Sequence, residues 1–237
     1  MMAEKPVRIG DKIEVRYDAG RWMLLRELRK KAIHIMEILF RYGIQTIIHG
    51  SIARGDVKET SDVDVFIPHV VSSFLVEHAL ENIKEDFFSR EIVQATPQYA
   101  PKAYIYLEDK VSVSFPLVDL RRLEKEFYYF GGALDLDELK EDKRVPGVDK
   151  RLMFIEPTKY GHIESPVIGR EATVAKSLGV SLDIVNQRVR VLTKRDDVGR
   201  TGVYLKRVLE KNESFEQVIK RISDKDPIVR KRVQIKR

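Results

Sequence analysis

The sequence predicts an α/β (α+β) fold, in which a mixed sheet is flanked by helices and is followed by a small, basic, mainly helical domain. Three observations lead to this prediction. Over residues 1–130, short β-rich runs alternate with segments of helical periodicity. Glycine and proline then break the pattern, and helical periodicity returns from residue 170. The hydrophobic content of 43 % is sufficient for a packed core.

The first predicted element is a long amphipathic helix at residues 21–42. Its apolar residues recur at helical spacing, and they are Leu25, Leu28, Ala32, Ile35, Met36 and Leu39. Gly43 is suited to end this helix. A short β-rich run at 46–49 follows, and the chain then turns at Gly50-Ser51 into a second predicted helix.

Residues 62–67 alternate acidic and apolar side chains, which predicts a strand with one polar face. The same patterns predict a helix at 74–88, strands at 91–95, 103–107 and 111–115, and a helix at 119–129. We expect these elements to complete the first domain, at residues 1–130.

Residues 131–164 carry glycine or proline at many positions, among them Gly131-Gly132 and Pro146-Gly147. We interpret this segment as an irregular connection between domains. The C-terminal domain is therefore predicted at residues 165–237.

The composition excludes several classes of protein. The chain has no cysteine, which excludes disulfides and thiolate zinc sites and fits a reducing compartment. Its apolar runs are far shorter than the roughly 20 residues that span a bilayer. The first ten residues lack the apolar segment of a signal peptide. We expect a cytoplasmic protein that does not bind membranes.

Positive charge is concentrated toward one end of the sequence. Residues 151–237 hold 20 Lys/Arg and 11 Asp/Glu, whereas residues 1–150 hold 23 and 26. A local excess of positive charge is typical of a phosphate-binding module. The alternative is a solvated, charge-rich surface such as heat-adapted proteins carry.

One short motif combines a glycine-serine turn with two carboxylates: Gly50-Ser51, ten further residues, and then Asp62 and Asp64. Hard cations such as Mg²⁺ prefer carboxylate oxygens, and residues two apart on a strand point to the same face. We therefore predict Asp62 and Asp64 as catalytic, metal-binding residues. Gly50 allows close approach of a phosphate, and Ser51 at a helix start offers it hydroxyl and N–H donors. Arg54 is expected to add positive charge near the phosphates.

Residues 49–56 and 61–66 resemble the Gly-Ser…Asp-x-Asp motif of the polymerase-beta-like nucleotidyltransferase superfamily. The chain looks most like archaeal predicted nucleotidyltransferases with a C-terminal helix-turn-helix. The resemblance implies transfer of a nucleoside monophosphate from a nucleoside triphosphate (NTP) to an acceptor hydroxyl, with Mg²⁺ or Mn²⁺ as cofactor. On this interpretation Gly50, Ser51 and Arg54 bind the nucleotide.

The superfamily pattern also includes a third carboxylate on a later strand, which binds metal and helps to deprotonate the attacking hydroxyl. The best-placed strand here is 111–115, whose polar face shows Ser112 and Ser114. Serine is a weak metal ligand and no base at neutral pH. An alternative function is therefore a DNA-binding regulator whose degenerate nucleotidyltransferase domain binds nucleotide without turnover. A nucleotidyltransferase that modifies a partner protein is a third hypothesis.

Residues 171–192 resemble a helix-turn-helix, with Gly179 at the turn. Asn186, Gln187 and Arg190 share the outer face of the second helix, where such side chains can read base edges. Residues 194–204 are expected to form a wing with Arg200 near its tip, or else a loop that leads into another helix. A winged-helix-like, nucleic-acid-binding domain follows from this interpretation. The alternative is a plain helical pair that docks on the first domain.

Overall fold

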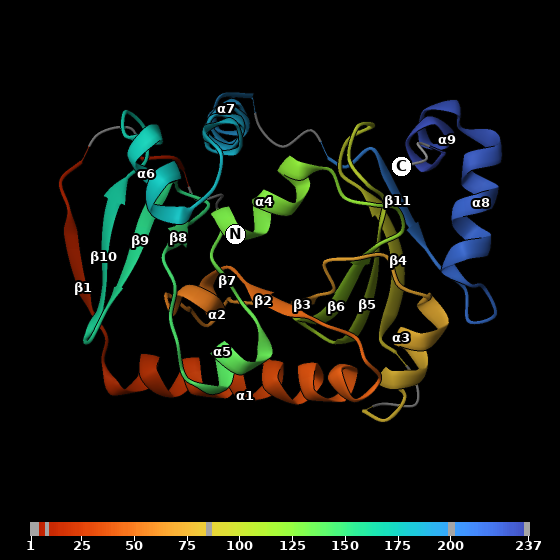
Figure 1. Cartoon of the computed structure of the whole chain (residues 1–237), viewed down its shortest axis with the longest axis horizontal. Coiled ribbons are helices and arrows are strands. Elements are labelled where there is room, and N and C mark those ends of the chain that lie inside the picture. Colours follow the sequence, from red (N-terminus) through yellow and green to blue (C-terminus); the bar gives the residue numbers. More distant parts are fainter. Residues whose placement is uncertain (1–4, 8–9, 84–86, 199–201, 235–237) are drawn as a thin grey trace. The chain divides into compact units, whose positions relative to one another are not determined.

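The structure is a computed structural model that describes residues 5–7, 10–83, 87–198 and 202–234 (Figure 1). The chain forms two compact units, each built from three separate stretches. Unit 1 comprises Met1–Ile33, Ile48–Ser61 and Lys125–Thr201, and unit 2 comprises His34–Ile47, Asp62–Glu124 and Gly202–Arg237. Helix α1 (Ala19–Arg41) runs through both. Within the described ranges, no helix is long and apolar enough to span a membrane.

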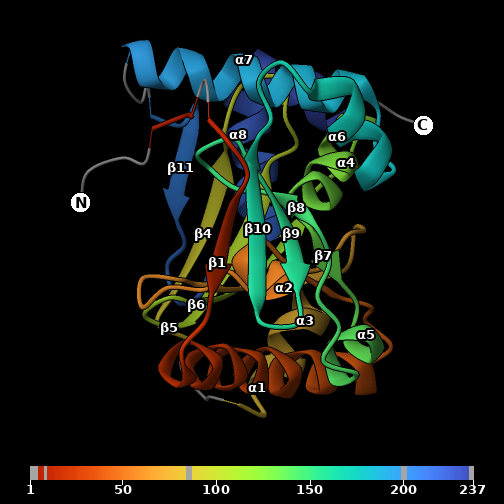
Figure 2. The same ribbon diagram turned by 90° about the vertical axis from the view of Figure 1, so that its left-hand side faces the viewer.

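The centre of unit 1 is an antiparallel sheet with the strand order β1-β10-β9-β8 (Figure 2). The strands are β1 (Ile13–Arg16), β8 (Gly147–Val148), β9 (Met153–Thr158) and β10 (Gly161–Pro166). Gly161 faces Arg16 across the β1–β10 pair, and a Cβ on it would lie 1.9 Å from the Val15 carbonyl oxygen. This glycine therefore lets two strands approach closely instead of breaking one.

The remaining elements of unit 1 are short strands and helices. They are β2 (Ile47–His49), paired with β7 (Ala133–Leu134), and the helices α2 (Ser51–Arg54), α4 (Arg122–Phe130), α5 (Leu136–Lys140), α6 (Glu171–Leu178) and α7 (Leu182–Val198). Helix α5 begins with a capping box formed by Asp135 and Glu138. The prediction of an irregular connection at 131–164 was therefore wrong, because these residues form β7, α5, β8, β9 and part of β10.

In unit 2 the strands follow the order β11-β4-β5-β6-β3. They are β3 (Val63–Phe66), β4 (Ser89–Gln94), β5 (Lys102–Glu108), β6 (Val111–Pro116) and β11 (Leu205–Val208). Strands β3 and β6 are parallel, whereas the other pairs are antiparallel. The predicted mixed sheet is therefore confirmed. Helix α3 (Ser73–Leu80) is shorter than the helix predicted at 74–88.

The sheet of unit 2 has one apolar and one polar face. Val63, Val65, Val113 and Phe115 are fully buried, and Phe115 contacts Phe215 of α8 (Phe215–Lys225) with ring centroids 5.6 Å apart. The alternate residues of the same strands form the opposite face. This polar face carries Asp64 on β3.

The predicted wing is not formed by the described residues. Residues 194–198 continue helix α7, and 205–208 form β11, which pairs antiparallel with β4 in unit 2. Without β11, β4 would be an edge strand with unpaired backbone N–H and C=O groups, and pairing with β11 satisfies them. The winged-helix-like arrangement predicted for 165–237 was therefore wrong, since residues from 202 onward belong to unit 2. Arg200 lies outside the described residues.

A buried ion pair fixes the C-terminal helix α9 (Pro227–Val233) within unit 2. An Arg232 nitrogen lies 2.8 Å from Glu124, and each side chain is 5 % exposed. Glu124 also accepts hydrogen bonds from the backbone N–H groups of Ala100 and Arg121, while Arg232 donates to the Asp119 carbonyl oxygen. Removing either partner would leave a buried charge without its counter-charge.

We predict that Arg232→Met lowers the free energy of unfolding by about 3 kcal/mol, because Glu124 is left charged and buried. Lys231→Met is the matched control, since Lys231 is an exposed neighbour on the same helix. Urea unfolding at pH 7 measures both variants. Equal stability of the two variants would contradict the prediction.

Candidate active site

The Gly50-Ser51 turn links β2 to the short helix α2. Gly50 has φ 76° and ψ −141°, a conformation that favours glycine, and its N–H donates to the Gly132 carbonyl oxygen at 2.9 Å. A Cβ on Gly50 would have no atom within 4 Å. The backbone here is therefore bare on one side, as close approach of a phosphate requires.

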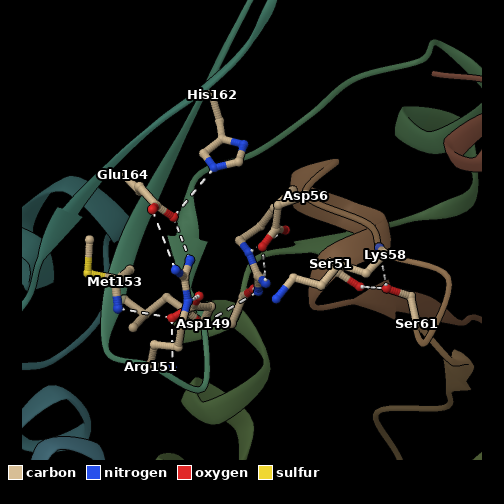
Figure 3. Close-up of polar contacts among 12 residues, drawn as sticks. Ser51, Asp56, Lys58, Ser61, Asp149, Arg151, Met153, His162 and Glu164 are labelled. Carbon is tan, nitrogen blue, oxygen red and sulfur yellow. Dashed lines mark hydrogen bonds and ion pairs between the residues drawn. The ribbon is translucent and has the colours of Figure 1, made fainter. Parts of the chain in front are cut away.

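The Ser51 hydroxyl is held by the loop that follows α2 (Figure 3). It donates to Ser61 Oγ at 3.2 Å, and Ser61 Oγ also accepts from the Lys58 N–H at 2.9 Å. The Ser51 side chain is only half-buried. The contact with Ser61 orients the hydroxyl and leaves its oxygen able to accept a further hydrogen bond.

A buried arginine of α1 binds the carbonyl end of α2. Arg29 is 3 % exposed and donates to the carbonyl oxygens of Ile52, at 3.0 and 3.2 Å, and Ala53, at 3.3 Å. Because α2 has only four residues, the carbonyl oxygens of Ile52 and Ala53 have no helical N–H partner, and the Arg29 guanidinium donates to them instead. Burial lowers the pKa of Arg29, and the nearby Asp142 opposes that effect.

Arg54 has a different place from the one predicted. It is 5 % exposed, and its guanidinium binds both oxygens of Asp56 at 3.0 Å and the carbonyl oxygens of Gly131 at 2.5 Å and Val148 at 3.4 Å. These contacts tie the end of α2 to the turn before β7 and to β8. They give Arg54 a structural role that local sequence could not reveal, because Gly131 and Val148 lie 77 and 94 residues away. Nucleotide binding by Arg54 stays a prediction.

We predict that Gly55→Ala destabilises the protein by about 3 kcal/mol. Gly55 has φ 97°, and an added Cβ would lie 2.5 Å from Cδ of Arg144. Gly43→Ala is the matched control, because Gly43 has φ 74° but open space around it. Its cost should be only the backbone strain of about 1–2 kcal/mol. Urea unfolding measures the loss of stability in both variants. Equal losses would contradict the prediction, because they would show that Arg144 moves away from the added Cβ and relieves the collision.

In unit 2, Asp62 is exposed just before β3, and Asp64 is half-buried on it. The parallel register places Asp64 opposite Ser112 and Phe66 opposite Ser114. The Ser112 hydroxyl donates a short hydrogen bond to Asp64 Oδ1. A serine thus occupies the position on the neighbouring strand where the resemblance implies a third carboxylate.

The other carboxylates of the polar face do not supply a third ligand. Glu91 on β4 lies three strands from β3, or about 14 Å at the spacing of paired strands, and it forms an ion pair with Lys206 at 3.0 Å. The described part of the chain contains no group of three acidic or histidine side chains that could hold a metal. Mg²⁺ is often bound by one or two carboxylates together with substrate phosphates, so Asp62 and Asp64 fit that donor set.

Next to the carboxylates, β5 carries Tyr104 and Tyr106 on the polar face. Burial is the main cause that raises the pKa of each phenol, and Asp64 adds to it for both. Both hydroxyls therefore stay protonated at neutral pH. Lys102, two residues before Tyr104, has its pKa lowered to about 8 by burial, against the opposing charge of Glu124.

Unit 1 holds a second polar cluster, formed by the turn between β8 and β9, by β10 and by Tyr17 just after β1 (Figure 3). Arg151 binds Asp149 at 2.7 Å and forms a short hydrogen bond with Glu164. His162 Nδ1 lies 2.6 Å from the Tyr17 hydroxyl, and its Nε2 lies 3.6 Å from Glu164. Burial raises the pKa of Tyr17 to about 12, so the phenol donates and Nδ1 accepts. Burial lowers the pKa of His162, which agrees with a neutral ring.

The neutral state of His162 predicts a pH dependence of stability. Its folded-state pKa lies below the unfolded value of 6.5, so acidification protonates the unfolded chain first. This contribution is complete above pH 6.5 and is lost as the pH falls from 6.5 through the folded-state pKa. We expect His162→Gln to reduce the loss of stability between pH 7 and 5, measured by urea unfolding. The control is His34→Gln, at an exposed position, which should lose as much stability between pH 7 and 5 as the wild type. An equally large loss in His162→Gln would contradict the assignment of His162 as a neutral ring.

The helical pair predicted at 171–192 is confirmed as α6 and α7, with Gly179 in the left-handed region at φ 65°. Asn186 and Arg190 are exposed and Gln187 is half-buried. On another face of α7, the Arg188 guanidinium lies 5.0 Å from the Phe127 ring centroid of α4. This contact is what the alternative of a docked helical pair requires, and nucleic-acid binding by the outer face stays a prediction.

Part of the basic surplus toward the C-terminus is paired within unit 2. Lys206 binds Glu91, Arg207 and Arg221 bind Glu213, and Arg232 binds Glu124. Arg230 donates to the backbone carbonyl oxygens of residues 223 and 224. These charges therefore have structural partners, which weakens the argument from charge to a nucleic-acid partner.

Comparison with known proteins agrees with the motif. Residues 29–123 match the family described as "Nucleotidyltransferase domain". A protein of Methanocaldococcus jannaschii named "Putative protein adenylyltransferase" is 38 % identical over 65 residues, which cover 25 % of this chain and 73 % of that protein. No solved structure matches the chain. The chain belongs to the nucleotidyltransferase-domain family, and the recognition made from Gly50-Ser51 and Asp62-x-Asp64 is confirmed.

Proposed function

We propose that this protein is a Mg²⁺-dependent nucleotidyltransferase that moves a nucleoside monophosphate from an NTP to an acceptor hydroxyl. The proposal rests on one observation: this chain, which belongs to the nucleotidyltransferase-domain family, carries Asp64 on the polar face of β3 and Asp62 just before the strand. Mn²⁺ is the alternative cofactor. Both ions prefer carboxylate and phosphate oxygens.

Each residue of the motif has a defined task in this proposal. The bare backbone at Gly50 and the hydroxyl of Ser51 hold the triphosphate. Asp62 and Asp64 hold the metal, which when bound stabilises the attacking and leaving oxygens as a Lewis acid. The acceptor oxygen forms a bond to the α-phosphorus while the bond to the bridging oxygen breaks and pyrophosphate leaves. Arg54 and Arg29 act as positioning residues for the turn.

The hydroxyl of Ser112 affects the proton of the acceptor. A third carboxylate at this position would accept that proton, whereas serine does not act as a base at neutral pH. Asp64 Oδ1 already accepts a hydrogen bond from the Ser112 hydroxyl, and a carboxylate oxygen can accept more than one. In the proposed reaction the proton therefore passes to Asp64, to Asp62 or to water. We expect slower turnover than a site with three carboxylates would give.

A second candidate places the acceptor hydroxyl on a partner protein. The name of the relative from Methanocaldococcus jannaschii favours it, since that protein is described as a protein adenylyltransferase. A nucleic-acid acceptor remains the alternative, with Asn186, Gln187 and Arg190 as the proposed contacts. The regulator hypothesis, nucleotide binding without turnover, rests on Ser112 and Ser114, which stand where a third carboxylate is expected.

We predict that Asp62→Asn/Asp64→Asn lowers pyrophosphate release by about 1,000-fold, because the neutral amides cannot hold the cation that stabilises the transition state. Release is measured with each of the four NTPs and Mg²⁺ or Mn²⁺, with and without nucleic acid. Asp109→Asn is the matched control, because Asp109 is exposed in the β5–β6 turn. It should retain full activity.

Unchanged release in the double variant would exclude Asp62 and Asp64 as the metal site. If the wild type releases no pyrophosphate but still binds NTP and metal, the regulator hypothesis replaces the transferase. Activity that requires an added protein, and not nucleic acid, would select the second candidate.

A further inference from the structure

The polar face of the unit 2 sheet carries a pair of tyrosine rings. Tyr104 and Tyr106 are two residues apart on β5, so they stand on the same face. Their ring centroids are 6.2 Å apart, and the ring planes differ by 16°. Both side chains are partly exposed. The pair therefore offers a nearly parallel aromatic surface that a flat group can reach.

Strand register places this surface beside a carboxylate. Tyr106 lies opposite Ser112 on β6, and Ser112 lies opposite Asp64 on β3. Asp64 and Tyr106 thus occupy one row across three strands, and their backbones are about 10 Å apart at the usual strand spacing. A single nucleotide is long enough to bridge this distance. A base against the rings can therefore belong to a nucleotide whose phosphate lies near Asp64.

Another stacked aromatic pair of unit 2 lies on the opposite side. Phe74 and His78 of α3 have parallel rings with centroids 6.1 Å apart. On β4, Arg90 is next to the polar-face residue Glu91, so its side chain lies on the apolar side of the sheet. Arg90 binds Glu77 of α3 at 2.9 Å, which places α3 on that apolar side. This pair is therefore remote from the carboxylate face, which leaves Tyr104 and Tyr106 as the pair with access to the chemistry.

We propose that Tyr104 and Tyr106 stack a nucleobase beside the carboxylates. Bases stack on aromatic side chains with little dependence on their identity, because every base has a π-face. Lys102 lies two residues before Tyr104 on the same face, with its ammonium 5.4 Å from the Phe66 ring centroid. This cation adds positive charge on the face where the base would stack.

The inference rests on the proposed function, in which two sources deliver a base to this face. One is the donor NTP, and the other is the terminal nucleotide of a nucleic-acid acceptor. The shared chemistry is a stacked base, and the experiment separates the sources. A stacked base is measured by binding, so the result does not depend on turnover.

The probes contain 2-aminopurine, whose fluorescence falls when it stacks. One probe is 2-aminopurine riboside triphosphate with Mg²⁺, and the other is a single-stranded oligoribonucleotide with 2-aminopurine at its 3′ end, without NTP. Wild type is compared with Tyr104→Leu/Tyr106→Leu and with Tyr104→Phe/Tyr106→Phe, which keeps both rings. Thermal unfolding confirms that each variant is folded.

We expect quenching of one probe by the wild type, at least tenfold weaker binding of that probe by the leucine variant, and nearly full binding by the phenylalanine variant. The quenched probe identifies the source of the base. The proposal is overturned if the wild type quenches neither probe, whether or not the variants fold, or if the leucine variant binds as tightly as the wild type. Pyrophosphate release, measured in parallel, tests the proposed function separately, so quenching without release retains the base site alone.

Discussion

The Gly50-Ser51 turn depends on two buried guanidinium groups. Helix α2 has four residues and leaves the Ile52 and Ala53 carbonyls without helical partners, so Arg29 of α1 binds them. Arg54 then joins the end of α2 to Asp56, to the Gly131 carbonyl and to β8. A buried arginine lowers the stability of the fold unless its hydrogen-bond acceptors are present. The carbonyl groups of α2 are likewise unfavourable without the arginine that donates to them. This mutual requirement holds the glycine turn in one conformation before any ligand binds.

Local patterns predicted the parts of the chain whose structure local chemistry decides. The alternation around Asp64 predicted β3, and helical spacing predicted α1 and α6 to within a few residues and also the start of α7, which continues to Val198 beyond its predicted end. Contacts between distant residues were not predictable in this way. Arg29 stands on the apolar side of α1, and only its partners on α2 explain a charge there. β11 pairs with β4, which lies more than 100 residues earlier in the chain. Gly161 was interpreted as part of an irregular segment, whereas it permits close pairing of β1 and β10.

The functional residues show the same division. The spacing of Gly50, Ser51, Asp62 and Asp64 identified the family, because few other arrangements place a phosphate turn and two carboxylates so close in sequence. Strand register places Asp64, Ser112 and Tyr106 in one row across three neighbouring strands, and no spacing in the sequence reveals this arrangement. This register is the basis on which we expect slow turnover, and it places an aromatic surface in the same row as Asp64. Our proposals therefore place the metal-binding carboxylates and the base-binding rings on one polar face of a mixed sheet.

The most direct test of the central claim is a crystal structure of the protein with Mn²⁺ and a non-hydrolysable NTP, with the anomalous scattering of Mn²⁺ recorded. Our account predicts Mn²⁺ coordinated by the carboxylates of Asp62 and Asp64, with the triphosphate against the backbone at Gly50 and the hydroxyl of Ser51. Mn²⁺ bound without either carboxylate, or a triphosphate bound away from this turn, would contradict it.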